Sequence, residues 1–166
     1  MSRVAGFLNS YAKMNDMIHE IETTQIKDLL TEQVQAIRNR NISKATKNYS
    51  TNVLVFDVVG PLSQPRGVRS VEERLEQWLA TFAEEAPINF ELVDVAISAD
   101  GNLAFSHSFN HINVPLKNGG SLDMYWRETL NWRKNNGEWK IVHAHSSVPF
   151  DPATGNASTG LKPEPR

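Results

Sequence analysis

The fold is decided by residues 88–147, INFELVDVAISADGNLAFSHSFNHINVPLKNGGSLDMYWRETLNWRKNNGEWKIVHAHSS. Runs rich in β-branched and aromatic residues alternate here with short runs of turn residues, as consecutive strands and hairpin turns do. The turns are Ala99-Asp100-Gly101-Asn102, Lys117-Asn118-Gly119-Gly120 and Asn135-Asn136-Gly137. The pattern therefore predicts four antiparallel strands, near 88–98, 103–114, 122–133 and 139–147.

Upstream of the strands, apolar residues recur at three- and four-residue steps, which is typical of amphipathic helices. The first such stripe is made of Val4, Phe7, Leu8, Tyr11, Met14, Ile18 and Ile21. Glu22-Thr23-Thr24 interrupts this stripe, and either threonine can cap the helix that follows. We therefore expect one helix over residues 4–21 and a separate one near 24–40.

The remaining elements lie between residues 42 and 87. A short helix is expected over 42–49, a strand at Val53–Phe56 and a further helix near 70–85, which Ser70 and Glu73 would begin as a capping box. Helices that precede a meander imply helices packed on one face of an antiparallel sheet. A sheet of such long strands must curl to bury its apolar face.

The predicted fold class is therefore α+β, a cone in which a curved antiparallel sheet wraps around helices, with an extra N-terminal helix. We divide the chain into a helical extension (1–23), the cone domain (24–150) and an irregular C-terminal tail (151–166) rich in proline, glycine and small residues. A curled sheet that is closed by helices leaves a mouth, so we expect one pocket inside it.

Composition limits the classes of function. The chain has 166 residues, a formal net charge of −2 and no cysteine. The charge gives no strong reason to bind nucleic acid or an anionic membrane, and the absence of cysteine excludes disulfides and thiolate metal sites. The N-terminus has no long apolar run, so neither a signal peptide nor a membrane span is expected. We expect a cytoplasmic protein without a cofactor.

The pattern resembles the cystatin-like cone of nuclear transport factor 2, in its SnoaL-like and ketosteroid-isomerase-like branch. The resemblance spans roughly residues 24–150 and is most specific in the run from Gly137 to Ser147; a similar run closes the association domain of calmodulin-dependent kinases. The other matching pieces are Val55-Phe56-Asp57, Arg66-Gly67, Trp78, Asp100 to Phe105 and Arg127-Glu128-Thr129. This resemblance implies steroid isomerases, polyketide cyclases, dehydratases and epoxide hydrolases as relatives, besides modules that only bind or oligomerise.

The resemblance makes Asp57 the leading candidate for a general base. A carboxylate at the rim of an apolar cavity can take a proton from carbon beside a carbonyl, since desolvation raises its pKa. The alternative is a strand-end aspartate that accepts backbone N–H groups in the Gly60-Pro61 turn.

An isomerase of this kind also needs an oxyanion hole, which the family forms from a tyrosine on the first core helix and a protonated aspartic acid on a late strand. The family spacing places Gln33 at the tyrosine position, which is no phenol. The late-strand acid falls near Arg127 to Thr129, where the only carboxyl is that of Glu128. Authentic steroid isomerase activity is therefore not expected.

Two histidines on the last strand, His143 and His145, are two residues apart and so point to one face, which Trp139 and Ile141 share. We expect that face to line the pocket, with His143, His145 and Arg127 orienting the substrate or stabilising an oxyanion. The alternatives are histidines satisfied in the sheet or at a dimer interface, and an Arg127 paired with Glu128, Glu91 or Asp123. A third metal ligand at a suitable spacing is lacking, so no metal is predicted.

The aromatic residues supply the expected lining of the pocket. In this lining, together with Asp57 and a histidine, we place Trp78, Phe82, Phe105, His107, Phe109, Tyr125 and Glu128. The opposite strand face, with Met124, Trp126, Leu130 and Trp132, is too apolar to remain in water and predicts a homodimer through the sheet.

The function expected from these features is acid–base chemistry of isomerase, cyclase or dehydratase type on a small, largely apolar molecule with a carbonyl or acidic group. The alternatives are a non-catalytic module for ligand binding or oligomerisation, and a partner-docking role for the helix in residues 1–23.

Overall fold

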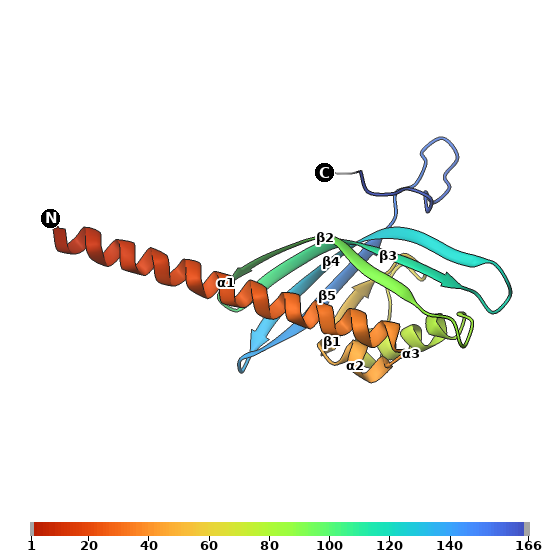
Figure 1. The fold of residues 1–166 in the computed structure, drawn as a ribbon, viewed down its shortest axis with the longest axis horizontal. Helices are drawn as coiled ribbons and strands as arrows, with labels where there is room; N and C mark the ends of the chain where they lie inside the picture. The colour runs from red at the N-terminus through yellow and green to blue at the C-terminus, as the bar shows by residue number, and fades with distance from the viewer. Residues whose placement is uncertain (1, 165–166) are drawn as a thin grey trace.

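A computed structural model describes residues 2–164 of the chain, with side chains over 13–164. The elements follow in the order α1 (Ser2–Arg38), α2 (Ile42–Thr46), β1 (Tyr49–Phe56), α3 (Val68–Leu79), β2 (Asn89–Asp100), β3 (Leu103–Pro115), β4 (Ser121–Asn135) and β5 (Glu138–Ser147). The four predicted C-terminal strands are confirmed. Figure 1 shows the strands as one curved sheet, with α2, α3 and the second half of α1 against one side of it and the C-terminal tail drawn above the sheet.

The sheet has the strand order β1-β5-β4-β3-β2. The long strands β2 to β5 form an antiparallel meander, and β1 joins its β5 edge in parallel. The prediction had placed Val53–Phe56 in a strand, and the strand in fact begins at Tyr49. The first strand thus pairs with the last, which brings residues 49–56 beside residues 141–145.

Two buried clusters hold the helices on the sheet. One joins Ile26 and Leu30 of α1 to Trp132 of β4 and Ile141 of β5, and the other packs the end of α1 against Phe82 and the far ends of the strands. Trp132 is 1% exposed and Ile26 is fully buried. These clusters lie on a single face, which we call the inner face of the sheet; the opposite face is the outer face.

Helix α1 runs without a break from Ser2 to Arg38, so the predicted interruption at Glu22-Thr23-Thr24 is wrong. Thr23 does not leave the helix because its hydroxyl donates back to the carbonyl oxygens of His19 and Glu20, each at 3.0 Å. The division of the chain at residue 23 stays a prediction, and its boundary falls inside a continuous helix.

Helix α3 begins two residues before the predicted cap. Gly67 occupies the N-cap position with φ 106°, a left-handed conformation that glycine adopts without strain, and no side chain caps the helix there. Glu73 pairs instead with Arg69, at 3.0 Å, so the Ser70–Glu73 capping box is wrong.

A β-bulge in β5 determines which side chains reach the inner face. Ile141 lies opposite Trp132 of β4, yet the next pair is His143 with Asn131, so Val142 is an extra residue. An extra residue reverses the alternation of side chains beyond it. Ile141 and Ala144 are therefore both buried on the inner face, whereas His143 lies on the outer face.

No helix within residues 2–164 has the length and apolar character needed to cross a lipid bilayer.

Candidate functional site

The middle of the inner face carries polar side chains between the two apolar clusters. Glu128 of β4 lies there because it is two residues from both Trp126 and Leu130, which pack under the helices, and side chains two apart share a face. Its two carboxyl oxygens accept hydrogen bonds from Asn110 Nδ2 of β3, at 2.9 Å, and from Ser146 Oγ of β5, at 3.1 Å. Two neighbouring strands therefore hold one carboxyl group in a fixed orientation.

Asn110 is itself fixed, since its Oδ1 accepts from Ser108 Oγ at 2.8 Å. It is only 2% exposed. A buried amide whose oxygen is already engaged can turn only its NH₂ group toward Glu128, so the Glu128 oxygen acts as acceptor.

Burial raises the pKa of Glu128, and the hydrogen bonds from Asn110 and Ser146 oppose this rise without cancelling it. Desolvation disfavours the charged form of any carboxyl group. Glu128 therefore holds its proton to a higher pH than an exposed glutamate does, and in the protonated form it can donate a hydrogen bond.

A phenol lies close to this carboxyl. Tyr49, the first residue of β1, accepts a hydrogen bond at its hydroxyl from Gln33 Nε2 of α1, at 3.3 Å. Burial raises the pKa of Tyr49, the charge of Glu128 raises it further, and Arg74 acts in the opposite direction. The phenol thus stays protonated, and it is electrostatically coupled to both a carboxyl and a guanidinium group.

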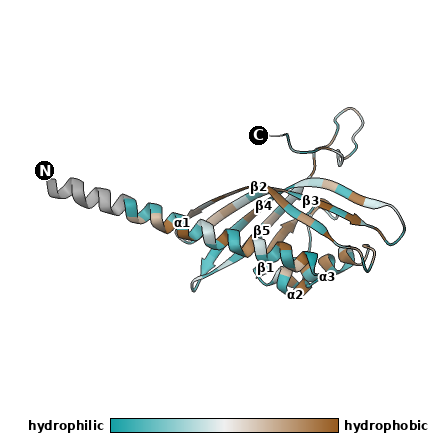
Figure 2. Cartoon of the chain, in the orientation of Figure 1, coloured by the Kyte–Doolittle hydropathy of each residue, from teal (hydrophilic) through white to brown (hydrophobic). Residues whose placement is uncertain are grey.

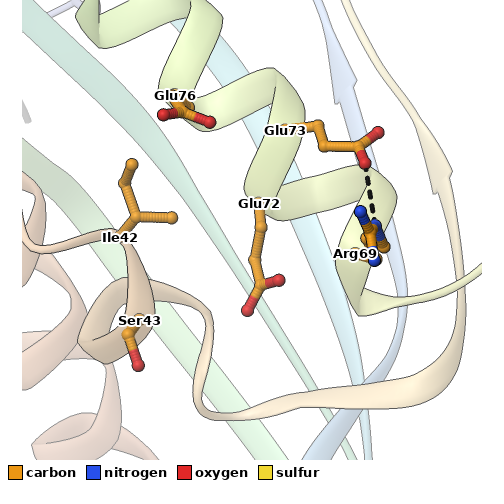
Figure 3. Close-up of a pocket in the computed structure, with 6 residues that line it drawn as sticks. All are labelled: Ile42, Ser43, Arg69, Glu72, Glu73 and Glu76. Atoms are coloured by element: carbon orange, nitrogen blue, oxygen red, sulfur yellow. Dashed lines mark hydrogen bonds and ion pairs between the residues drawn. The ribbon is translucent and has the colours of Figure 1, made fainter.

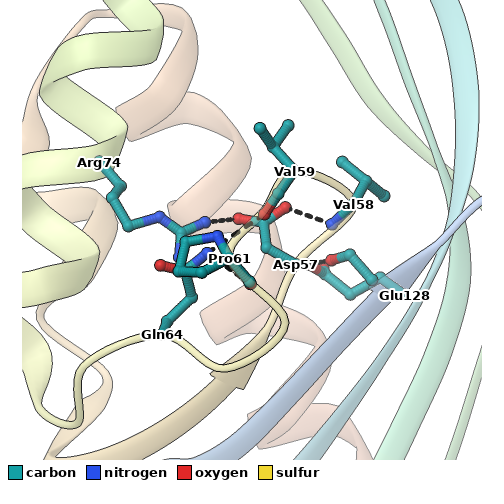
Figure 4. A network of polar contacts seen from close by, with 8 residues as sticks. Asp57, Val58, Val59, Pro61, Gln64, Arg74 and Glu128 are labelled. Carbon is teal, nitrogen blue, oxygen red and sulfur yellow. Dashed lines mark hydrogen bonds and ion pairs between the residues drawn. The ribbon is translucent and has the colours of Figure 1, made fainter.

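Asp57 follows directly on β1 and forms an ion pair with Arg74 of α3. Its other oxygen accepts from the backbone N–H of Val58, at 2.6 Å. Figure 4 shows this pair at the loop after β1, with Gln64 beneath it and Glu128 in the same close view. Burial lowers the pKa of Arg74, while Tyr49 favours its charged form. Asp57 therefore belongs to the same polar group as Tyr49 and Glu128.

Aromatic side chains border this polar group on the inner face. Trp78 of α3 lies edge-on to Phe82, with ring centroids 4.9 Å apart, and to Trp126 of β4, at 6.2 Å. Phe82 is fully buried, whereas Trp78 is half-buried. Trp78 can therefore meet a ligand from solvent, while Phe82 serves as packing behind it.

The face assigned to His143 and His145 is wrong. Because of the bulge at Val142, the two histidines lie on the outer face and not with Trp139 and Ile141. His143 Nδ1 lies 2.9 Å from the carbonyl oxygen of Leu54, and both imidazole rings contact Phe56 edge-on.

Arg127 also lies on the outer face, because it alternates with Glu128 along β4 and pairs in register with Phe109 and Ser147. Two of the partners proposed for it, Glu91 and Asp123, contact His111 instead, at 2.9 and 2.8 Å. We therefore do not place Arg127 beside Glu128.

Four residues expected in the pocket lining, all on β3 and β4, point away from the inner face. They are Phe105, His107, Phe109 and Tyr125, which alternate with the buried residues Ser106, Asn110 and Ile112 and with Trp126. Phe105 is 45% exposed.

The residues predicted to form the homodimer interface are also on the wrong face. Met124, Trp126, Leu130 and Trp132 belong to the buried clusters under the helices, so that set cannot bind a second copy without unfolding.

Two open hollows lie on the surface of the described part. One is between α2 and α3 and is lined by Ile42, Ser43, Arg69, Glu72, Glu73 and Glu76, as Figure 3 shows. The other lies between α1 and β2 and is lined by His19, Thr23, Thr24, Lys27, Val95 and Ile97. Neither includes Glu128, so an enclosed pocket at the polar group stays a prediction. Among residues 13–164, no three His, Asp or Glu side chains are grouped as metal ligands.

Sequence reasoning missed Tyr49, Asn110, Ser146 and Arg74 as members of this group. Gln33, which the family spacing indicated, is in fact the residue that bonds the phenol of Tyr49. The phenol therefore comes from β1 and not from the first core helix. The one available signal was that a tyrosine precedes the β-rich run at 53–56.

Comparison with known proteins agrees with this fold. The model of the SnoaL-like domain matches residues 26–151. The chain therefore belongs to the SnoaL-like family. No curated protein matches it.

Solved structures share the fold. An NTF2-like protein of unknown function from Pseudomonas putida KT2440 is 28% identical, with a TM-score of 0.74 over 84% of this chain and 95% of that one. A candidate dehydratase of the NTF2-like family from Streptomyces avermitilis is 17% identical, with a TM-score of 0.67 over 80% and 99%. A candidate calcium/calmodulin dependent protein kinase II association domain from Xanthomonas campestris is 19% identical, with a TM-score of 0.62 over 74% and 84%. Other matches are described as cystatin-like folds, which confirms the predicted cone.

Proposed function

We propose that this chain is a cofactor-independent acid–base enzyme of isomerase, cyclase or dehydratase type, acting on a small, largely apolar molecule with a carbonyl or acidic group. The observation that carries the proposal is the half-buried carboxyl of Glu128, which two strands orient beside the phenol of Tyr49. The candidate dehydratase from Streptomyces avermitilis is compatible with this class and shares the fold alone.

Each residue has a defined task in this proposal. Asp57, ion-paired with Arg74, takes a proton from the carbon next to the substrate carbonyl. The electron pair moves onto the carbonyl oxygen, to which protonated Glu128 and the Tyr49 hydroxyl donate hydrogen bonds. Asp57 then returns the proton to another carbon of the enolate, or a β-hydroxyl leaves as water with a proton from Glu128.

Proton exchange tests the proposal without knowledge of the natural substrate. In D₂O, the enzyme should catalyse exchange of the α-hydrogens of small cyclic ketones and unsaturated ketones, observed by proton NMR. Replacement of the proposed base, Asp57→Asn, should lower the exchange rate at least about a hundredfold, and Glu128→Gln should lower it about tenfold or more. His145→Ala, on the outer face, is the matched control and should leave the rate unchanged. A rate indifferent to Asp57 and Glu128 would exclude this site.

A second candidate function is a non-catalytic module that binds a small molecule or assembles subunits. It is favoured by the engagement of both Asp57 oxygens, one by Arg74 and the other by the Val58 N–H, which leaves a weaker base. The likeness to the association domain from Xanthomonas campestris is compatible with it in fold. Ligand-induced stabilisation without any proton exchange would select this candidate.

We further propose a homodimer through the outer face of the sheet. Apolar side chains there remain accessible in the single chain, among them Leu103 at 57% exposure, Phe105 at 45% and Phe56 at 37%. Sedimentation should show that the wild type self-associates. Phe105→Lys should abolish association through the outer face, while the control Asn113→Lys, at the end of β3, should have little effect.

A further inference from the structure

The two halves of α1 have different surroundings. From His19 onward the helix is attached to the sheet: His19 Nδ1 lies 2.8 Å from the Ala99 carbonyl oxygen, and Glu22 pairs with Lys134 at 3.2 Å. Ile26 and Leu30 then enter the core. Before His19 the helix extends beyond the sheet, as Figure 1 shows. Residues 13–18 are all exposed.

The projecting half has apolar residues that its own subunit leaves in water. Met14 is 46% exposed, Met17 55% and Ile18 43%; Ile21, in the first turn of the attached half, is also 51% exposed. Figure 2 colours α1 by hydropathy from the point where its side chains are described. A helix gains most of its stability from packing an apolar face, so such a stripe requires a partner.

The spacing of the stripe indicates what that partner is. Its residues follow alternating steps of three and four at Val4, Phe7, Tyr11, Met14, Ile18 and Ile21. These are the a and d positions of three consecutive heptads, the repeat that pairs one helix with another. The next a and d positions, Gln25 and Asp28, are polar, so the repeat stops where α1 docks on its own sheet.

We propose that residues 4–21 of α1 form a coiled coil with the same segment of a second copy of this chain. The partner is a second copy because an identical helix supplies the same repeat of knobs and holes, whereas strands present side chains at a period of two and offer no matching spacing of 3.5 residues. This interface is separate from the outer face of the sheet and independent of the catalytic proposal.

The area available is close to what a stable pair needs. Seven large apolar side chains on the stripe, Leu8 included, would each bury on the order of 60–120 Å². Each copy would therefore contribute roughly 400–800 Å², compared with about 800 Å² per partner in an interface of standard size.

Sedimentation velocity on the full chain, three single variants and one double variant tests the proposal. Ile18→Lys places a charge in the seam of the coiled coil, and Asp16→Lys places the same residue on the outer side of the helix as a matched control. Phe105→Lys removes the outer-face interface. We expect Ile18→Lys to weaken self-association at least about a hundredfold, because both copies lose a buried isoleucine. Asp16→Lys should behave as the wild type.

The outcomes separate the two interfaces. If the helices pair, Phe105→Lys alone remains a dimer, and only Phe105→Lys combined with Ile18→Lys is a monomer. A monomeric Phe105→Lys protein, or an Ile18→Lys protein that associates like the wild type, would overturn the helix pairing. An equal loss of self-association in Ile18→Lys and in Phe105→Lys would also overturn the helix pairing, since it would show that the helix covers the partner's sheet. Failure of the outer-face proposal alone would appear as a wild-type assembly that is insensitive to Phe105→Lys and sensitive to Ile18→Lys.

Discussion

The inner and outer faces of the sheet come from the same strands and differ in every second residue. On the inner face of β4, Glu128 lies between Trp126 and Leu130, all three under the helices. On the outer face of the same strand, Arg127 and Thr129 are exposed. The comparison shows that the position of the candidate site is determined by the phase of alternation and only secondarily by composition, because histidines and aromatic residues occur on both faces.

A single residue sets this phase on β5. The bulge at Val142 moves Ala144 and Ser146 to the inner face, where Ser146 bonds Glu128, and moves His143 and His145 to the outer face. If Val142 paired regularly with β4, His143 would take the place of Ala144 beneath the helices and His145 would take the place of Ser146.

Insertion of one alanine between Ala144 and His145 should therefore have the largest effect. It would bring the side chain of His145 inward and that of Ser146 outward, burying an unpaired imidazole and breaking the hydrogen bond from Ser146 to Glu128. We expect a loss of more than about 4 kcal/mol in the free energy of unfolding, measured by urea denaturation. Deletion of Val142, the extra residue of the bulge, is the control: it leaves Ala144 inward and His143 outward and should cost about 1–2 kcal/mol. An insertion variant of wild-type stability would contradict the assignment of faces.

Truncation of one large aromatic on each face should give the next largest difference. Trp132 is 1% exposed, and its Nε1 donates to Ser106 Oγ at 3.0 Å. Trp132→Ala should therefore lower the free energy of unfolding by about 3–5 kcal/mol. Phe105→Ala on the outer face should cost about 1 kcal/mol or less in the monomer. Thermal or urea unfolding at low protein concentration measures both, and equal losses would show that the two faces are equally buried.

The pH dependence of stability should distinguish the inner carboxyl from exposed ones. Below about pH 4.5 Glu128 is protonated in both folded and unfolded chains. As the pH rises above this value the unfolded chain loses the proton first, so the free energy of unfolding falls until the folded carboxyl also ionises. Glu128→Gln should remove this decrease, whereas Glu138→Gln, which is exposed, should keep it. A wild-type profile without the decrease would contradict a raised pKa.

The outer face should give the smallest effect, through His111. Burial lowers the pKa of His111, but its hydrogen bonds to Asp123 and Glu91 raise it more, so it lies above 6.5 in the folded chain. The contribution of His111 to the free energy of unfolding is then complete below about pH 6.5 and is lost as the pH rises through the pKa of His111 in the folded chain. His111→Gln should lower the melting temperature slightly at pH 6 and not at pH 9. An equal change at both pH values would mean that charge plays no part.

The strands could be predicted from the sequence because their turns are local. Gly101, Gly119 and Gly137 all adopt positive φ, and the observed strands begin and end within about two residues of the predicted ones. The helix break could not be predicted correctly, because Thr23 satisfies its hydroxyl within the helix and so resembles an N-cap only in sequence.

The site could be predicted only in part, because its parts meet through distant pairings. Asp57 and Glu128 were identified from the sequence and both lie in the polar group. Tyr49 is electrostatically coupled to Glu128 only because β1 joins β5, and local periodicity cannot reveal that pairing. The histidines were misplaced because a bulge of one residue leaves no mark in the pattern of apolar residues.

The parallel pairing of β1 with β5 also has a consequence for the order of folding. The hairpins of β2, β3 and β4 close through short loops and can form as soon as each strand has left the ribosome. β1 is made early but must wait for residues 141–145, so the sheet is completed last at this edge. We expect a nascent chain that ends before residue 138 to contain Tyr49, Asp57, Arg74 and Glu128 and still to have no assembled site.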